Sequence, residues 1–223
     1  MNKAVDLIKE TLKGKSLYRI LFNWQVARHC VNLEGVCVDL ACGKKPASYW
    51  RYWKINLSRL VRIDASKEAK PDIEADLNQG IPLDNDFADN IFMFNSFYLI
   101  KDPQTLAREI ARVLKPGGRA FITAQFIKSE ENRADDRFRF TSRQLKEIFG
   151  CAGFAGAQIF PTGERFSAIG NLADFVIGNS LAANCLKIIF RPMCLLADKI
   201  LPKKVKQNYP CPLAWFVIAK KVF

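Results

Sequence analysis

Short apolar runs that carry a carboxylate at or near their end recur in the first half of the chain. The first, residues 36–40 (VCVDL), is followed at once by the small residues Ala41, Cys42 and Gly43. A run of this kind is typical of a parallel strand that is buried on both faces. Small residues after the strand let the backbone pass close to a ligand. The pattern therefore predicts a buried strand whose carboxyl end delivers a turn to a nucleotide-like ligand.

Similar runs follow at regular spacing. Residues 60–64 (LVRID), 72–77 (DIEADL) and 89–95 (DNIFMFN) each predict a further strand. A helical pattern over 105–114 is stopped by the residues KPGG, and a fifth strand is expected over 119–124. Strands that alternate with helical segments predict a doubly wound parallel sheet.

The order of these pieces resembles that of the class I S-adenosylmethionine-dependent methyltransferases, in their type 11-like group that modifies small molecules and glycans. The resemblance covers residues 35–160 well. It implies S-adenosyl-L-methionine as the cofactor and an α/β, Rossmann-like, doubly wound sheet of seven mostly parallel strands with an antiparallel last strand. The segments that carry it are 38–43 (VDLACG), Asp64, 84–95 (DNDFADNIFMFN), 109–118 (EIARVLKPGG), and 139–141 (RFT) with 152–154 (AGF).

Two further segments have helical periodicity, one before the first strand and one after Leu181. A closing run over 212–220 is similar to the last strand of that family. A chain of 223 residues is an ordinary size for one α/β domain with a large core. We therefore expect a single domain, 1–223, made of an N-terminal helical cap (1–34), a cofactor-binding core (35–160), a helical insertion between strands six and seven (161–211) and a last strand (212–223).

The resemblance also implies a role for individual residues. For each of the acids Asp39, Asp64 and Asp76, a plainer alternative is that it is a loop or helix-cap residue. The resemblance implies that Asp39 supports the first turn near the methionine end of the cofactor, and that Ala41, Cys42 and Gly43 let the backbone approach the cofactor closely. It implies that Asp64 accepts hydrogen bonds from the ribose hydroxyls and that Asp76 and Leu77 lie against adenine. It also implies that Asn95 and Ser96 face the methyl group.

The chain departs from the family at places that bear on catalysis. Ala41 replaces the first glycine of the usual motif, and Lys45-Pro46 belongs to a loose form of a Cys-Gly-x-x-Pro-Tyr variant. Tyr98-Leu99 stands where many relatives have Glu-His, and no histidine precedes the RFT segment. The catalytic residue is therefore left unassigned. Carboxylates of the charged loop before RFT are candidates for a base, with a solvated loop as the plainer interpretation: Glu130, Asp135 and Asp136.

The net charge is +12, which indicates either an anionic partner or a plain basic surface. Residues 178–206 are both basic and apolar, so they predict either contact with a membrane interface or packing on the sheet or on a second copy. No uninterrupted apolar run is long enough to span a bilayer. Seven scattered cysteines without a CxxC pair, and His29 as the sole histidine, argue for reduced thiols and against a metal site. With no signal peptide evident, we expect a cytoplasmic protein, with peripheral contact at the inner membrane surface as one alternative for the basic apolar segment.

Three hypotheses about function follow. The first is methyl transfer to a small or carrier-linked acceptor, such as a sugar of a cell-surface glycan or a lipid-linked intermediate. The second is a non-catalytic relative that binds a cofactor or a partner. The third, a nicotinamide-dependent oxidoreductase, is disfavoured because no GxGxxG follows the first strand. A nucleic acid is an unlikely acceptor, since 95–98 (NSFY) only partly resembles the tetrapeptide of base-methylating relatives.

Overall fold

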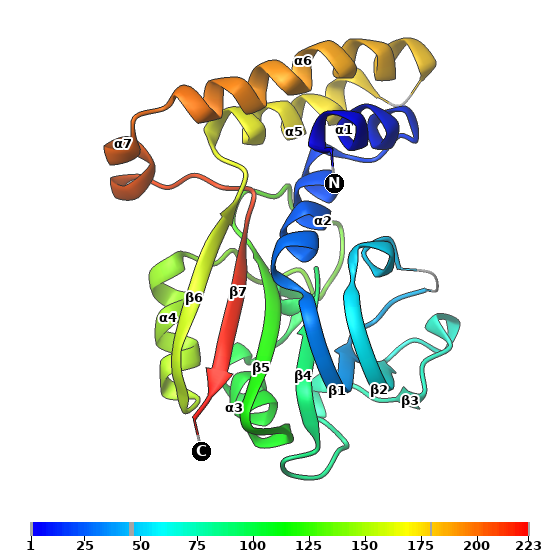
Figure 1. The fold of residues 1–223 in the computed structure, drawn as a ribbon, viewed down its shortest axis with the longest axis vertical. Helices are drawn as coiled ribbons and strands as arrows, with labels where there is room; N and C mark the ends of the chain where they lie inside the picture. The colour runs from blue at the N-terminus through cyan, green and yellow to red at the C-terminus, as the bar shows by residue number, and fades with distance from the viewer. Residues whose placement is uncertain (1, 45–46, 179, 223) are drawn as a thin grey trace.

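Seven strands form one mixed sheet in the computed structural model, which describes residues 2–44, 47–178 and 180–222 (Figure 1). The strand order is β3-β2-β1-β4-β5-β7-β6. Neighbouring strands from β3 to β5 pair in parallel, whereas β7 pairs antiparallel with both β5 and β6. The predicted sheet with an antiparallel last strand is confirmed. The strands are β1 (Val31–Leu40), β2 (Lys54–Asp64), β3 (Ile73–Glu74), β4 (Ala88–Met93), β5 (Leu114–Gln125), β6 (Phe154–Thr162) and β7 (Ala214–Lys221).

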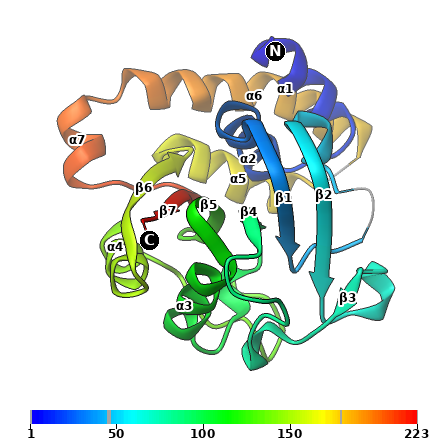
Figure 2. The ribbon, with the colours of Figure 1, turned by 60° about the horizontal axis from the view of Figure 1, so that its bottom comes forward.

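The helices form two groups. Two of them cover one face of the sheet within the core; the others gather toward one end of the sheet, where α2 also packs on the opposite face (Figures 1 and 2). The core helices are α3 (Pro103–Val113) and α4 (Ser142–Cys151); the others are α1 (Lys3–Leu12), α2 (Leu17–His29), α5 (Arg165–Ile177), α6 (Leu181–Ile200) and α7 (Lys203–Asn208).

Several element boundaries differ from the sequence-based expectation. β1 begins at Val31, so the end of the expected N-terminal cap is already strand. The expected third strand shrinks to Ile73–Glu74, because Asp76 accepts a hydrogen bond from the Asn78 backbone and starts a 3-10 turn there. The KPGG stretch does end α3, but its residues belong to β5.

The two faces of the sheet are covered in different ways. On one face α3 and α4 pack against strand residues such as Ile91 and Met93. On the other face α2 packs with Phe22 against Phe94. The described residues of the connection from β1 to β2 add no α-helix to that face; they contain a 3-10 turn, η1 (Trp50–Tyr52). Aromatic rings from this connection take the place of a helix in burying the face.

The insertion between β6 and β7 holds α2 in position. α5 and α6 pack together, and α1 packs on α6 (Figure 2). The Asn171 side chain accepts a hydrogen bond from the Tyr18 backbone at 2.9 Å, and the Asp174 carboxylate accepts one from Leu17 at 3.0 Å. These backbone N–H groups lie in the first turn of α2, where a helix offers no internal acceptor. The insertion therefore fixes the end of α2 that faces the candidate site.

Candidate functional site

Two cavities meet where β1 and β4 end. The first is about 450 Å³ and the second about 510 Å³. Both are lined by Ala41, Phe94 and Asn95. Ligands of open α/β sheets bind outside the carboxyl ends of the strands, and each volume lies in the range of small-molecule sites. The joined cavities therefore form the candidate site.

The turn after β1 forms one wall of the first cavity, to which Ala41, Cys42 and Gly43 all contribute. Ala41 has φ 49°, a left-handed conformation that costs a non-glycine residue about 1–3 kcal/mol. The Gly43 N–H donates to the Asp64 carboxylate at 2.9 Å, and its carbonyl accepts from the buried Arg62 guanidinium at 3.0 Å. The strained turn is thus held from both sides by the end of β2.

Asp64, Asp76 and Leu77 line the second cavity. The second Asp64 oxygen accepts from the Ser66 N–H at 2.8 Å, so both its oxygens already serve the local backbone. Asp76 lines the cavity and also caps a 3-10 turn, and the hydrogen bonds from Asn78 lower its pKa. The structure therefore shows the capping role of this acid, and its contact with adenine stays a prediction.

Asp39 lies elsewhere. Its side chain is fully buried and accepts a hydrogen bond from the Tyr49 hydroxyl at 2.8 Å, and it is not among the residues that line either cavity. Burial raises the pKa of Asp39 to about 7. Asp39 therefore lies below the site, where its hydrogen bond with Tyr49 joins the end of β1 to the aromatic β1–β2 connection. Lys45 and Pro46 of that connection lie outside the described residues.

The raised pKa of Asp39 predicts a pH-dependent stability. The folded protein keeps this proton up to about pH 7, whereas an unfolded aspartate loses it near pH 4. The stabilising contribution is therefore complete below about pH 4 and is lost as the pH rises to about 7. Asn at this position still accepts from Tyr49 but does not titrate. We expect the free energy of unfolding of wild type to fall relative to that of Asp39→Asn between about pH 4 and 7, as measured by urea denaturation. A difference that does not change with pH would contradict this.

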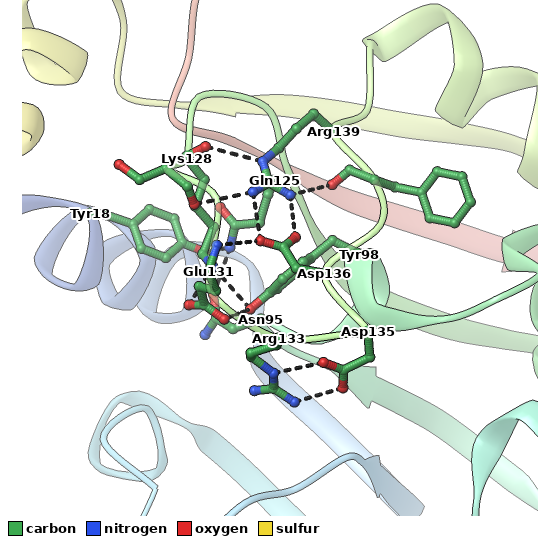
Figure 3. Close-up of polar contacts among 12 residues, drawn as sticks. Tyr18, Asn95, Tyr98, Gln125, Lys128, Glu131, Arg133, Asp135, Asp136 and Arg139 are labelled. Atoms are coloured by element: carbon green, nitrogen blue, oxygen red, sulfur yellow. Dashed lines mark hydrogen bonds and ion pairs between the residues drawn. The ribbon is translucent and has the colours of Figure 1, made fainter.

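Asn95 stands at the junction of the cavities in a left-handed conformation, with φ 61°. Its backbone N–H donates to the Thr123 hydroxyl at 2.7 Å, and its side-chain oxygen accepts from the Tyr18 hydroxyl (Figure 3). The Gln125 amide donates to the same Tyr18 oxygen at 3.0 Å. Burial raises the pKa of Tyr18 to about 12, so this hydroxyl is a neutral donor at physiological pH. α2, β4 and β5 thus converge on one polar cluster.

A charged loop covers the far side of this cluster (Figure 3). Asp135 pairs with Arg133 at 2.7 Å, and Asp136 pairs with Arg139 at 2.6 Å. These partners lower the pKa of both carboxyls, which makes them weak bases. Glu131 pairs with Lys128, which likewise lowers its pKa.

Sequence reasoning did not single out Tyr18 or Gln125. It also missed Lys15, Ser16 and Arg19, which line the first cavity from the start of α2. These residues lie far along the sequence from the motif turn, so no local pattern connects them with the site. The one sequence signal was general: helices ahead of the first strand often cap the site in the resembled family.

The comparisons agree with this geometry. Residues 37–122 match the family model described as a methyltransferase domain. That segment contains the motif turn, Asp64, Asp76 and Asn95, which are the residues gathered around the two cavities. This segment is similar to methyltransferase domains, and the fold is that of the class I methyltransferases. The expectation of S-adenosylmethionine as cofactor is supported by this match. A search of the curated proteins found no match for the chain.

Solved structures of other proteins share the fold of this chain. One is a chain of the complex between the Haloferax volcanii Trm112 methyltransferase activator and its methyltransferase, at 18% identity, covering 100% of this chain and 98% of that one, with TM-score 0.58. Phosphoethanolamine N-methyltransferase 2 of Haemonchus contortus, in complex with phosphomonomethylethanolamine and S-adenosylhomocysteine, is 16% identical over 91% of this chain and 52% of its own, with TM-score 0.57. The [4+2]-cyclase SpnF is 17% identical over 91% of this chain and 81% of its own, with TM-score 0.56. At these identities the likeness concerns the fold.

Proposed function

We propose that the chain binds S-adenosylmethionine across the two joined cavities and transfers its methyl group to a small or carrier-linked acceptor. The observation that carries this proposal is the meeting of the cavities at Ala41 and Asn95, at the carboxyl ends of β1 and β4. When bound, the cofactor supplies an electrophilic methyl group. Everything else required is positioning, since a methyl transfer needs the acceptor atom aligned with that group and water kept out.

The residues present fit such a ligand. Asp64 lies on the second cavity with a carboxylate that can accept from two ribose hydroxyls, and the exposed side of Gly43 has open space around it. Two buried hydroxyls, Ser48 in the first cavity and Ser96 in the second, have no hydrogen-bond partner among the described residues. A buried polar atom without a partner is costly, and a bound polar ligand would satisfy it. We assign the adenosine to the second cavity and the methionine end to the turn at Ala41–Gly43.

The first cavity also favours an acidic acceptor. Lys15, Arg19 and Lys44 all line it. Lys15 already pairs with Glu10 at 2.6 Å and Lys44 with Glu68 at 2.7 Å, so part of this charge is compensated. A phosphate or carboxylate on the acceptor would still find cations close to the junction. A sugar on a phosphate-linked carrier, of a glycan or of a lipid-linked intermediate, has this chemistry.

Asn95 lines both cavities, whereas Tyr18 and Gln125 line neither. They hold Asn95 in place, so this cluster positions the junction rather than removing a proton from the acceptor. Tyr18 is a neutral hydrogen-bond donor, and Asn95 and Gln125 fix its hydroxyl. Asp135 and Asp136 are held by arginines, which makes them poor proton acceptors. A sugar hydroxyl holds its proton tightly and would need a base that these side chains do not supply, so a more acidic group on such a carrier suits this arrangement better.

Tyr18→Phe tests this positioning role. We expect kcat of methyl transfer to fall about tenfold, because one hydrogen bond at the junction is lost. The Kd for S-adenosylmethionine should stay within about twofold, since the aromatic ring remains. The measurement is transfer of a radiolabelled methyl group into acceptor fractions of a cell extract, beside calorimetric titration of the cofactor. Tyr209→Phe, at an exposed tyrosine, is the matched control. Equal kcat for both variants would remove Tyr18 from the reaction.

The proposed function itself is tested by calorimetric titration of the protein with S-adenosylmethionine, S-adenosylhomocysteine and NADH. We expect binding of the two sulfur nucleotides and none of NADH. Binding of NADH alone would replace the proposal by the oxidoreductase hypothesis. Absence of binding for all three would leave a partner-binding relative of the fold.

A second candidate is a cofactor-binding protein that does not transfer methyl groups. Two observations favour keeping it: three carboxylates of the charged loop, Glu131, Asp135 and Asp136, are ion-paired, and a protein of the same fold is named a cyclase. A shared fold does not fix the reaction. Tight cofactor binding without methyl transfer to any acceptor fraction would favour this candidate.

A further inference from the structure

The amphipathic pattern of α6 is inverted. Its inward face carries Lys187 and Arg191, both about 1% exposed, together with Asp198. A helix on the surface of a globular protein normally buries its apolar stripe and exposes its charges. Here the apolar side chains are outside, and they are Leu181, Leu186, Ile189, Met193, Leu196 and Ile200, each more than half exposed.

α5 repeats this inversion beside α6. Ser167, Asn171 and Asp174 point inward and are engaged in hydrogen bonds. The outward residues are Phe166, Ile169, Leu172 and Val176, and Val176 is 89% exposed. We call the outward residues of α5 and α6 the docking face. The two helices pack together, and α6 is the outermost helix at their end of the molecule (Figure 1).

The inward charges explain how the inversion is tolerated. The Arg191 guanidinium donates to Asp174 at 2.8 Å and to the Thr11 hydroxyl at 2.7 Å. Asp198 accepts from the backbone N–H groups of Phe166 and Ser167 at the start of α5. The buried charges of Arg191 and Asp198 therefore have polar partners inside, and the apolar side chains of these helices face outward.

The charges around the docking face have one sign. Among the described residues of α1, α2 and the 164–208 segment, every acid is buried or half-buried. Asp6 and Glu10 bind inward partners, as do Asp174 and Asp198. The exposed charged residues of these helices are all cationic, namely Lys3, Lys9, Lys13, Arg28, Lys199, Lys203 and Lys204.

We propose that the docking face binds the surface of a bilayer that contains anionic lipids, with α5 and α6 lying in the interface. Apolar helices with a cationic rim and no exposed acid have the chemistry of such a surface: the apolar residues enter the acyl boundary and the lysines meet the headgroups. Within the part of the chain that the structure describes, no helix is both long and apolar enough to cross a membrane. Contact is therefore with one leaflet.

A groove beside the docking face has the same character. It measures about 830 Å³ and is lined by apolar side chains such as Leu195 and Leu196. Lys3, Arg28 and Lys199 also line it. Two acids, Glu164 and Asp198, border it, but Asp198 is occupied by the start of α5. Leu196 and Lys199 join the groove to the docking face, so an anionic headgroup with its chain could be seated there.

A second copy of this chain suits the face less well. Two copies would bring their cationic rims together, whereas no exposed acid of these helices could compensate them. The proposal does not rest on the cofactor or the reaction, so its failure would leave the proposed function standing.

Vesicle flotation tests the proposal. We expect the purified full chain to float with vesicles of phosphatidylcholine and phosphatidylglycerol at low salt, and much less with phosphatidylcholine alone. The triple variant Leu186→Gln, Ile189→Gln, Met193→Gln should lower the partition coefficient by about 100-fold, since it removes three inserting side chains. Lys203→Glu with Lys204→Glu should lower it by about 20-fold or more, and added salt should do likewise to the wild type.

The matched control is Arg143→Glu with Lys146→Glu, which makes the same charge change on exposed residues of α4. This variant should float like wild type, and circular dichroism with thermal melting should show all variants folded. Wild type that stays in solution with anionic vesicles would overturn the proposal. So would a lipid-free dimer, seen by sedimentation velocity, that the glutamine triple variant converts to monomer. Equal flotation of wild type and the triple variant would also overturn it.

Discussion

Asp64→Ala is expected to weaken S-adenosylmethionine binding about 100-fold. The carboxylate lies on the second cavity at the end of β2, where it can accept from both ribose hydroxyls. Hydrogen bonds to a charged group contribute about 1.5–3 kcal/mol each, and about 2.7 kcal/mol corresponds to a factor of 100 in Kd. Asp64 also holds the Gly43 N–H, so the variant loosens the turn beneath the methionine end as well. Calorimetric titration of the variant measures both effects together.

Two further variants separate these effects. Glu147→Ala removes the same charge at an exposed position of α4 that lines neither cavity, and should bind the cofactor like wild type. Asp64→Asn keeps one carbonyl acceptor, which can serve either Gly43 or a ribose hydroxyl, so we expect a loss between those of wild type and Asp64→Ala. A Kd for Asp64→Ala within about threefold of wild type would mean that the cofactor does not use this carboxylate.

Arg191→Ala is expected to lower the free energy of unfolding by about 3–5 kcal/mol. The guanidinium is almost fully buried, and its removal leaves the Asp174 carboxylate in the interior without its main cation. Removing one partner of a buried ion pair has a cost of about this size. For a domain of this length the change corresponds to a melting temperature lower by roughly 6–20 °C. Differential scanning calorimetry measures it directly.

Arg143→Ala, at an exposed arginine of α4, should change stability by no more than about 0.5 kcal/mol. Arg191→Lys, which keeps a cation beside the buried Asp174 carboxylate, should cost less than Arg191→Ala, because the carboxylate then keeps a charged partner in addition to Lys187. A loss below about 1 kcal/mol for Arg191→Ala would show that the helical layer unfolds independently of the sheet.

The parts of this fold that were predictable are those encoded locally. Buried parallel strands such as β1 and β4 appear as short apolar runs, and the glycine-rich stop after α3 is explicit in the sequence. The third strand was overestimated because alternation over 72–77 looks extended, whereas Asp76 turns the chain through a local hydrogen bond. Local hydrogen bonds of this kind compete with strand pairing and leave no periodic signal.

The candidate site was predictable where the residues of the sequence motifs themselves line the cavities. Seven of the eight expected cofactor residues line the two cavities, and Asp39 is the exception, because a carboxylate near a strand end can equally face the core. Tyr18 could not be found from the sequence, since its place depends on how α5 holds the start of α2. The inverted pattern of α6 could be predicted only in part. Its apolar and basic content was evident from the sequence. Which side of the helix faces inward depends on Asp174 and Thr11, which come from elsewhere in the chain.

The sheet ends in short or interrupted strands on both sides. β3 at one edge has two residues, and β6 at the other has a register shift between Phe154 and Ala157 and a proline at position 161. Long regular edges are what a second chain needs to add a strand, and proline cannot donate to such a ladder. Concentrated solutions of this protein should therefore resist fibrillar, strand-mediated aggregation, and any self-association should be sensitive to detergent rather than to agents that compete for backbone hydrogen bonds.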